Sequence, residues 1–113
     1  MNYTILIADD EPEIRTLLRL YLENENYQII EAENGKQALE LLKKEHVDLC
    51  LLDIMMPEMD GFDVLGFMKR SHMTEVIPVI MISSESSSSY IEKAYEMGAA
   101  DYISRPFNAL IVG

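Results

Sequence analysis

Short apolar segments alternate along the chain with longer segments in which apolar residues recur at helical spacing. The short segments are rich in β-branched residues and bounded by polar or turn-forming ones, which is typical of buried strands; they cover residues 3–8, 27–32, 47–52, 77–82 and 101–104. Apolar positions spaced by three and four residues indicate helices with one buried face, at about 11–26, around Ala38–Leu42, at 62–71 and around Ile91–Tyr95. Gly98 follows the last of these helices as an expected C-terminal stop.

This alternation predicts an α/β domain with a parallel sheet. Strands that are apolar throughout are buried on both faces, so helices should cover both sides of the sheet. At 113 residues the chain has the length of one domain, spanning residues 1–113. Asn108 is placed to cap a fifth helix, of which only a truncated first apolar turn, 109–112, remains. We therefore expect the chain to be the N-terminal part of a longer protein.

Charge and cysteine content narrow the classes of function. The chain carries 20 acidic and 9 basic side chains, a net charge of −11, and such a field repels the phosphates of nucleic acids and of anionic membranes. We expect no direct nucleic-acid binding by this segment and no membrane association. The single cysteine, Cys50, allows no internal disulfide and lies in an apolar strand, where a packed thiol is typical. Because the chain has neither a signal pattern nor an apolar run near the ~18 residues of a membrane span, the expected location is the cytoplasm.

Polar residues follow four of the five expected strands. Asp9 and Asp10 come after the first strand, Asp53 after the third, Ser83 after the fourth and Arg105 just after the fifth. In open α/β sheets ligands bind beyond the carboxyl ends of the strands, so these side chains should converge on one edge. Three carboxylates so close together repel each other unless protons or a cation neutralise them. Since no His or Cys stands at these positions, a hard divalent ion such as Mg²⁺ fits best, with Asp10 and Asp53 as direct ligands, Asp9 acting through water and a loop carbonyl just after Asp53 completing the set.

Each of these residues also has a simpler interpretation. Asp9 and Asp10 could equally be an acidic cluster stabilised by a helix dipole. Ser83 could simply start a loop, and Arg105 could form a salt bridge with one of the acids. Asp53 is harder to explain in this way, because a carboxylate at the end of the most apolar strand requires a partner or a ligand.

In order and spacing, the residues resemble the receiver domain of two-component response regulators, the CheY-like family. The resemblance covers the whole chain and rests on Asp9-Asp10, Asp53, the Met56-Pro57 and Asp60-Gly61 pairs of the following loop, Ser83, and the segment 101–107. It implies an open, doubly wound, flavodoxin-like sheet of five parallel strands in the order 2-1-3-4-5. It also implies a signalling switch that catalyses only its own phosphorylation and dephosphorylation, and is not a turnover enzyme.

The resemblance assigns roles to individual residues. Asp53 would be the phosphoacceptor, taking a phosphoryl group from a sensor histidine kinase, a phosphotransfer protein or a small phosphodonor. Asp10, Asp53 and the backbone carbonyl of Met55 would bind Mg²⁺ directly, and Asp9 would bind it through a water molecule. The resemblance also implies a C-terminal output domain, and a homodimer formed through the segment from the fourth helix to the fifth strand.

Two residues would relay the signal. Ser83 would donate a hydrogen bond to the phosphoryl group, and Tyr102 would be an aromatic switch that turns inward as Ser83 moves. Met55 and Glu85 stand two positions beyond Asp53 and Ser83, where side chains of the family line the approach to the phosphoryl group and tune its hydrolysis.

One position departs from the family pattern. Arg105 stands where the family has a lysine; the positive charge is kept, but the planar guanidinium has a different size and shape from an ammonium. The change bears on phosphorylation and switching, and it does not touch the expected Mg²⁺ ligands.

Two other functions compete with the switch. An Asp-nucleophile phosphatase of the haloacid-dehalogenase kind needs a second aspartate two residues after the nucleophile, where this chain has Met55. A degenerate receiver would act as a phosphorylation-independent interaction scaffold. The intact acidic triad argues against the scaffold, whereas Arg105 keeps it open.

Overall fold

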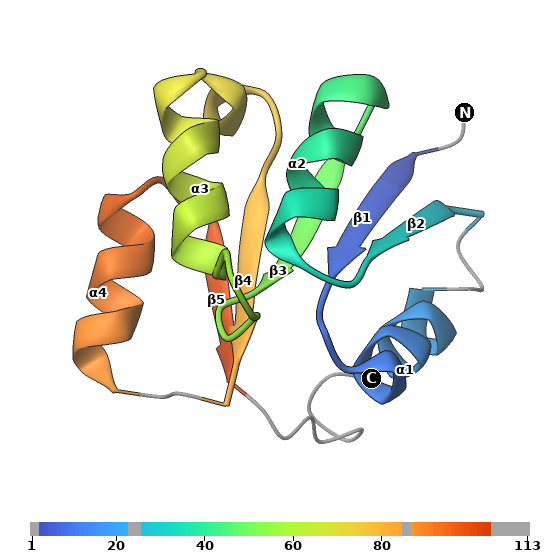
Figure 1. Ribbon diagram of the computed structural model, residues 1–113, viewed down its shortest axis with the longest axis horizontal. Helices are drawn as coiled ribbons and strands as arrows, with labels where there is room; N and C mark the ends of the chain where they lie inside the picture. Colours follow the sequence, from blue (N-terminus) through green and yellow to red (C-terminus); the bar gives the residue numbers. More distant parts are fainter. Residues whose placement is uncertain (1–2, 23–25, 85–86, 105–113) are drawn as a thin grey trace.

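The computed structural model describes residues 3–22, 26–84 and 87–104 as a parallel sheet with helices on both faces (Figure 1). All four strand pairings are parallel, and the strand order is β2-β1-β3-β4-β5. The strands are β1 (Thr4–Ala8), β2 (Gln28–Ala32), β3 (Leu49–Asp53), β4 (Val79–Ser83) and β5 (Asp101–Ser104). The helices are α1 (Pro12–Leu22), α2 (Gly35–Lys44), α3 (Gly61–Arg70), α4 (Ser88–Glu96) and a short 3-10 turn, η2 (Met73–Glu75). The expected fold class and strand order are confirmed.

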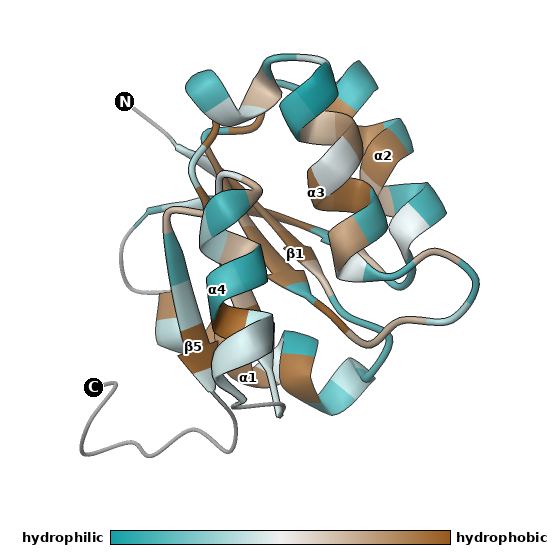
Figure 2. Cartoon of the chain, turned by 90° about the vertical axis from the view of Figure 1, so that its left-hand side faces the viewer, coloured by the Kyte–Doolittle hydropathy of each residue, from teal (hydrophilic) through white to brown (hydrophobic). Residues whose placement is uncertain are grey.

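The sheet divides the hydrophobic core into two parts. The larger part lies between the sheet and α2, α3 and α4, and includes Leu6, Leu52, Leu65, Met68 and Met81. The smaller part lies under α1 and contains Ile5, Ile7, Leu18, Leu51 and Ile82. Successive side chains of one strand pack alternately into the two parts of the core, because strand side chains alternate between the two faces of the sheet. Figure 2 shows the hydrophobic colour concentrated on the strands and the inner sides of the helices.

Local sequence signals set several helix ends. The Asn34 side chain accepts a hydrogen bond from the Gln37 N–H (2.8 Å) and so begins α2. Asp60 begins α3 through a reciprocal pair of bonds with Asp63. Gly98 ends α4 as predicted: its φ is 99°, and the N–H groups of Gly98 and Ala99 donate back to carbonyls of the last turn.

Other boundaries differ from the sequence prediction. The first helix was expected at about 11–26, but α1 ends at Leu22, and Asn26 has a left-handed φ of 59° that no α-helix can continue through. Strand β4 starts at Val79, after Pro78, which has no N–H to give to a strand ladder. The helix expected around Ile91–Tyr95 begins earlier in the structure, because α4 starts at Ser88.

Two further expectations concern the fifth helix and membrane-spanning segments. The fifth helix, with Asn108 as its cap, lies outside the described residues. Within the described ranges, no helix has the length and apolar character needed to cross a membrane.

Candidate functional site

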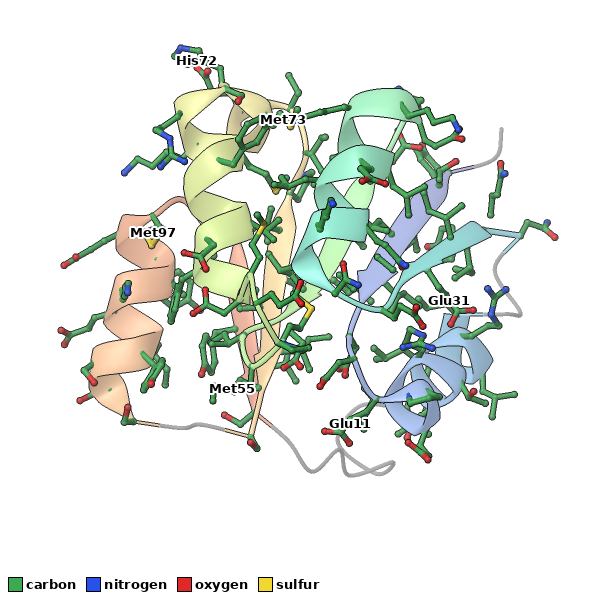
Figure 3. All side chains as sticks on the ribbon, viewed as in Figure 1. Glu11, Glu31, Met55, His72, Met73 and Met97 are labelled. Carbon is green, nitrogen blue, oxygen red and sulfur yellow. The ribbon has the colours of Figure 1, made fainter. Side chains whose placement is uncertain are left out.

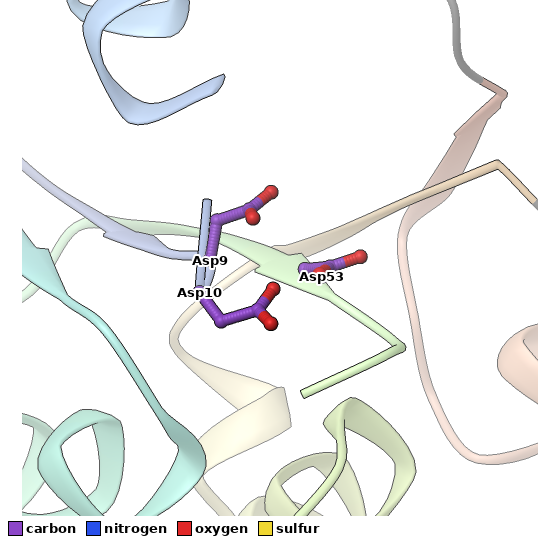
Figure 4. A group of neighbouring side chains, drawn as sticks. All are labelled: Asp9, Asp10 and Asp53. Atoms are coloured by element: carbon purple, nitrogen blue, oxygen red, sulfur yellow. The ribbon is translucent and has the colours of Figure 1, made fainter. Parts of the chain in front are cut away.

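Three carboxylates meet at the carboxyl ends of β1 and β3 (Figure 4). Asp9, Asp10 and Asp53 each offer one carboxylate oxygen, and these oxygens all lie within 4.8 Å of one another. Asp9 and Asp53 are each 1% exposed, whereas Asp10 is exposed to solvent. Like charges at this separation repel, and a donor set made only of oxygen suits a hard cation. The structure therefore brings together the three acids predicted to converge, and their chemistry fits Mg²⁺.

The sheet register explains this convergence. β1 and β3 are neighbours, and Ala8 pairs with Leu52, so the residues that follow, Asp9 and Asp53, lie side by side. The Asp9 N–H donates to the Ala32 carbonyl (3.0 Å), which extends the pairing of β1 with β2 by one step. The Asp9 Oδ1 accepts a hydrogen bond from the Glu11 N–H (2.9 Å). Hydrogen bonds with backbone groups thus hold Asp9 at the carboxyl end of the sheet.

The loop between β3 and α3 folds back tightly over Asp53. The Gly61 N–H donates to the Ile54 carbonyl (2.8 Å), and a Cβ atom at Gly61 would collide with the Asp53 carbonyl oxygen. Only glycine allows so close an approach of two backbones. Met55 lies in this loop, two residues beyond Asp53, with a side chain that is 59% exposed (Figure 3).

The same loop contains a backbone conformation that the sequence analysis did not predict. Glu58 has a φ of 66°, and the Met59 N–H donates to the Pro57 carbonyl (2.7 Å) across it. A non-glycine residue in the left-handed region is strained, and strain of this kind is frequent near functional sites. The Pro57-to-Gly61 segment of the sequence signals a turn, but not which of its residues takes the positive φ.

Ser83 and Tyr102 lie on neighbouring strands. Ser83 is the last residue of β4, is completely buried, and stands one position beyond Ile82, the register partner of Asp53. Tyr102 is half-buried, pairs with Met81 and packs with it against the larger part of the core. Because Ser83 follows Met81 by two residues, strand alternation places Ser83 and Tyr102 on the same face of the sheet. Arg105 and Glu85 lie outside the described residues.

The cysteine in the sheet is inert. Cys50 is completely buried in β3, and burial raises the pKa of its thiol to about 12. A thiol with so high a pKa is protonated at neutral pH and is a packing group, as expected from the sequence.

Arg15 is a residue near the site to which the sequence alone assigned no role. Its Nη1 donates to the Asp9 carbonyl (2.6 Å), and its Nε donates to Glu31 on β2 (2.9 Å). A basic residue soon after an acidic pair was the available signal. Its contact with β2 depends on how α1 packs, which the local pattern does not specify.

Comparison with protein families gives a match over nearly the whole chain. The model of the response regulator receiver domain matches residues 5–110. The response regulator GtcR of Aneurinibacillus migulanus is 48% identical over 110 residues, which are 97% of this chain and 44% of that protein. The transcriptional regulatory protein SrrA of Staphylococcus aureus is 42% identical over 108 residues, 96% of this chain and 44% of that protein. The chain spans less than half the length of these curated relatives.

Solved structures give the same result. The receiver domain of the Francisella response regulator 1452 superposes with a TM-score of 0.87 at 29% identity, covering 95% of this chain and 87% of that one. Response regulator TrrA of Thermotoga maritima, solved in complex with Mg²⁺-BeF, has a TM-score of 0.82 at 34% identity, with coverages of 94% and 89%. The chemotaxis protein CheY4 of Vibrio cholerae has a TM-score of 0.87 at 26% identity, with coverages of 96% and 90%. With its sheet order, its acidic site and these relatives, the chain belongs to the CheY-like receiver domains of two-component response regulators.

Proposed function

We propose that this receiver domain is a phosphoacceptor switch in which Asp53 takes a phosphoryl group from a sensor histidine kinase or a phosphotransfer protein. The observation that carries the proposal is the convergence of Asp9 and Asp10 on Asp53 at the ends of two central strands. A lone buried carboxylate would be a poor phosphoacceptor, because the negative charge that builds up during transfer would be unopposed. The acidic triad provides a place for the cation that opposes it.

In the transfer step, an oxygen of Asp53 attacks the phosphorus of a phosphohistidine. The new O–P bond forms as the P–N bond breaks, and the electron pair of that bond stays on the imidazole nitrogen. Asp10, Asp53 and the Met55 carbonyl would hold Mg²⁺ directly, and Asp9 would hold it through a water molecule. When bound, Mg²⁺ neutralises the charge of the acids and of the phosphoryl oxygens. The domain would act once per phosphoryl group, as a switch and not as a turnover enzyme.

The switch would run from Ser83 to Tyr102. The Ser83 hydroxyl would donate to a phosphoryl oxygen, and Tyr102 would turn inward as Ser83 moves toward the phosphate. Their shared face of the sheet supports this relay, because displacement of one side chain frees space beside the other. Arg105 would supply the positive charge at the phosphoryl group, while Met55 and Glu85 would tune its lifetime. The signal would pass to a C-terminal output domain or to a homodimer partner, in the cytoplasm.

Arg105, which stands where the family has a lysine, favours one alternative function, a degenerate receiver that serves as a phosphorylation-independent scaffold. The two functions are distinguished by incubating the protein with acetyl phosphate and Mg²⁺ and measuring its intact mass. We expect the mass of one added phosphoryl group in the wild-type protein and in Glu92→Gln, a control on the exposed surface of α4. Asp53→Ala should show no added mass, and Arg105→Lys should react faster than the wild type.

A wild-type protein that gains no mass from acetyl phosphate or from a phosphorylated histidine kinase would overturn the switch and favour the scaffold. Multiple turnovers of a phosphomonoester would instead favour a phosphatase.

A further inference from the structure

One arginine joins the acidic site to the edge strand β2. Arg15 lies in the first half of α1, and its side chain is only 13% exposed. Its Nη1 donates to the Asp9 carbonyl oxygen (2.6 Å), and its Nε donates to Glu31 Oε1 (2.9 Å). Glu31 belongs to β2 and lies beside α1 (Figure 3). A single rigid guanidinium therefore connects the loop that carries Asp9 and Asp10 with the neighbouring strand.

The contact with the Asp9 carbonyl determines more than the position of Asp9. The peptide unit is planar, so the Asp9 carbonyl and the Asp10 N–H lie in one rigid plane. A donor that fixes the direction of the carbonyl also fixes the direction in which Asp10 leaves that plane. Asp9 is additionally held through its N–H and its carboxylate, by Ala32 and Glu11. Asp10 is exposed, so the direction of this peptide plane contributes to how its side chain is presented to a cation.

We infer that Arg15 is a positioning residue for the metal site, and that the affinity of the site for Mg²⁺ depends on its contact with the Asp9 carbonyl. The inference rests on the proposed function, in which Asp9 and Asp10 serve a bound Mg²⁺. Residues that orient metal ligands through hydrogen bonds typically contribute 10- to 100-fold to metal affinity. The ion pair with Glu31 makes this role compatible with cation binding, because it compensates the positive charge that Arg15 brings near the site.

Arg19 supplies a matched control within the same ion-pair network. Its Nε and Nη2 both donate to Glu31 Oε2, at 3.0 and 2.5 Å, and among the described residues the hydrogen bonds of its side chain go to Glu31 only. Arg15→Gln and Arg19→Gln therefore remove the same charge and each deprive Glu31 of one partner. Loss of positive charge alone would strengthen cation binding slightly in both variants. A weaker affinity in Arg15→Gln alone reports the contact with Asp9.

The experiment is a calorimetric titration of the wild-type protein and its variants with MgCl₂ at fixed ionic strength. We expect Arg15→Gln to raise the Kd for Mg²⁺ about 10-fold, and Arg19→Gln to stay within about twofold of the wild type, as suits an exposed pair. The double variant Arg15→Gln/Glu31→Gln, which leaves the net charge unchanged, should bind as weakly as Arg15→Gln. Arg15→Lys, which restores charge and one donor, should recover part of the affinity.

A spectroscopic readout separates positioning from a general loss of stability. In NMR spectra of the wild-type protein, Mg²⁺ should shift the Nε–H resonance of Arg15 and leave that of Arg19 in place. Equal Mg²⁺ affinities for Arg15→Gln and Arg19→Gln, or an Arg15 signal that ignores Mg²⁺, would overturn the inference. A wild-type protein that binds no Mg²⁺ would overturn the proposed function itself, and with it this inference.

Discussion

Glu58 is the residue at which local conformation and side-chain identity disagree most clearly. Its φ of 66° lies in the left-handed region, which costs an L-residue about 1 kcal/mol and glycine almost nothing. The strain lies in the loop that connects β3 to α3. The loop holds this conformation because its ends are fixed by Asp53 in β3 and by the capping pair that begins α3.

Replacing Glu58 by glycine should therefore stabilise the domain. We expect Glu58→Gly to raise the free energy of unfolding by about 1 kcal/mol, measured by urea denaturation. Glu58→Ala is the control, because it removes the same side chain but keeps the backbone strain, and it should gain nothing. An equal gain in both variants would show that the side chain, and not the φ angle, is responsible.

At the scale of residues, the sequence predicted the three acids of the site but not the residues that hold them in place. Asp9, Asp10 and Asp53 follow from a simple rule, since each stands where an apolar strand ends. Arg15 does not, because its two acceptors belong to the loop after β1 and to β2, and the distance between them is set by helix packing. The positive φ of Glu58 is likewise a result of loop closure, which no single residue in Pro57–Gly61 encodes.

On the scale of the elements, α3 contains two glycines whose surroundings differ. A Cβ atom at Gly61 would strike the Asp53 backbone, which cannot move without displacing the Asp53 side chain. At Gly66 a Cβ atom would meet the ends of the Arg70 and Met97 side chains, at 3.3 and 3.4 Å, and these can shift.

These contacts predict opposite effects of the same substitution. Gly61→Ala should destabilise the domain by about 1–3 kcal/mol, as overpacking does, and should lower the rate at which Asp53 is phosphorylated. Gly66→Ala should be neutral or stabilising by up to about 1 kcal/mol, because alanine is the better helix former. Urea denaturation and the acetyl phosphate reaction measure both effects. A Gly61→Ala protein with wild-type stability and reactivity would contradict the close approach described for the loop.

The start of β3 is tied to the start of β1 by a side chain. Asp48 accepts a hydrogen bond from the Thr4 N–H (2.8 Å) and lies 2.9 Å from His46. The Thr4 bond, with a smaller contribution from His46, holds the pKa of Asp48 below its ordinary value. The apolar pattern predicted that this strand begins at Val47, but β3 begins at Leu49. The bond explains the difference, because the side chain of Asp48 is used to bind the first residue of the neighbouring strand β1.

The lowered pKa predicts a loss of stability in acid. Because the folded state holds this proton less tightly, the contribution of Asp48 is complete above its unfolded pKa of about 3.9 and is lost as the pH falls from there through the folded pKa. Glu31 shifts in the same direction, mainly through its hydrogen bond from Arg19. Asp48→Asn keeps an acceptor for Thr4 but cannot titrate, so its stability should vary less with pH below about 4. Unfolding curves in urea between neutral and acid pH test this, and an unchanged pH profile in Asp48→Asn would contradict it.

The apolar pattern located all five strands and four helices, but not their ends. Helix α1 was predicted too long because apolar spacing says where a buried face lies, not where the chain turns. It stops at Leu22, and the left-handed Asn26 marks the turn that follows. The end of α4 was predicted correctly because a glycine signals it directly, and Gly98 takes the positive φ that it requires.

On the scale of the whole molecule, the net charge is −11, and a bound cation would reduce the repulsion that this charge causes. Three carboxylates share one edge of the sheet, and in the absence of a cation their repulsion opposes folding. A ligand that binds only the folded state stabilises it, by about 2.7 kcal/mol at a concentration 100 times its Kd.

Asp10→Asn should uncouple stability from Mg²⁺. Without Mg²⁺ we expect this variant to melt at a higher temperature than the wild type, because one of the three repelling charges is gone. With Mg²⁺ the wild type should gain stability and the variant little. Thermal unfolding monitored by circular dichroism, with Glu92→Gln as the control for a charge lost elsewhere, measures this. The same Mg²⁺-dependent gain in wild type and Asp10→Asn would contradict the assignment of Asp10 as a ligand.

The strand order predicts different rates of hydrogen exchange for the acidic site and for Tyr102. Asp9 and Asp53 extend from β1 and β3, which lie inside the sheet, whereas Tyr102 belongs to β5 at its edge. Amide hydrogens of inner strands exchange only when most of the domain unfolds, while an edge strand opens locally at a lower free energy. We expect the amides of β5 to exchange faster than those of β3, and phosphorylation to slow β5 while leaving β3 unchanged. The carboxylate proposed to receive the phosphoryl group would then stay fixed in both states, while β5 would open locally before phosphorylation and become more ordered after it.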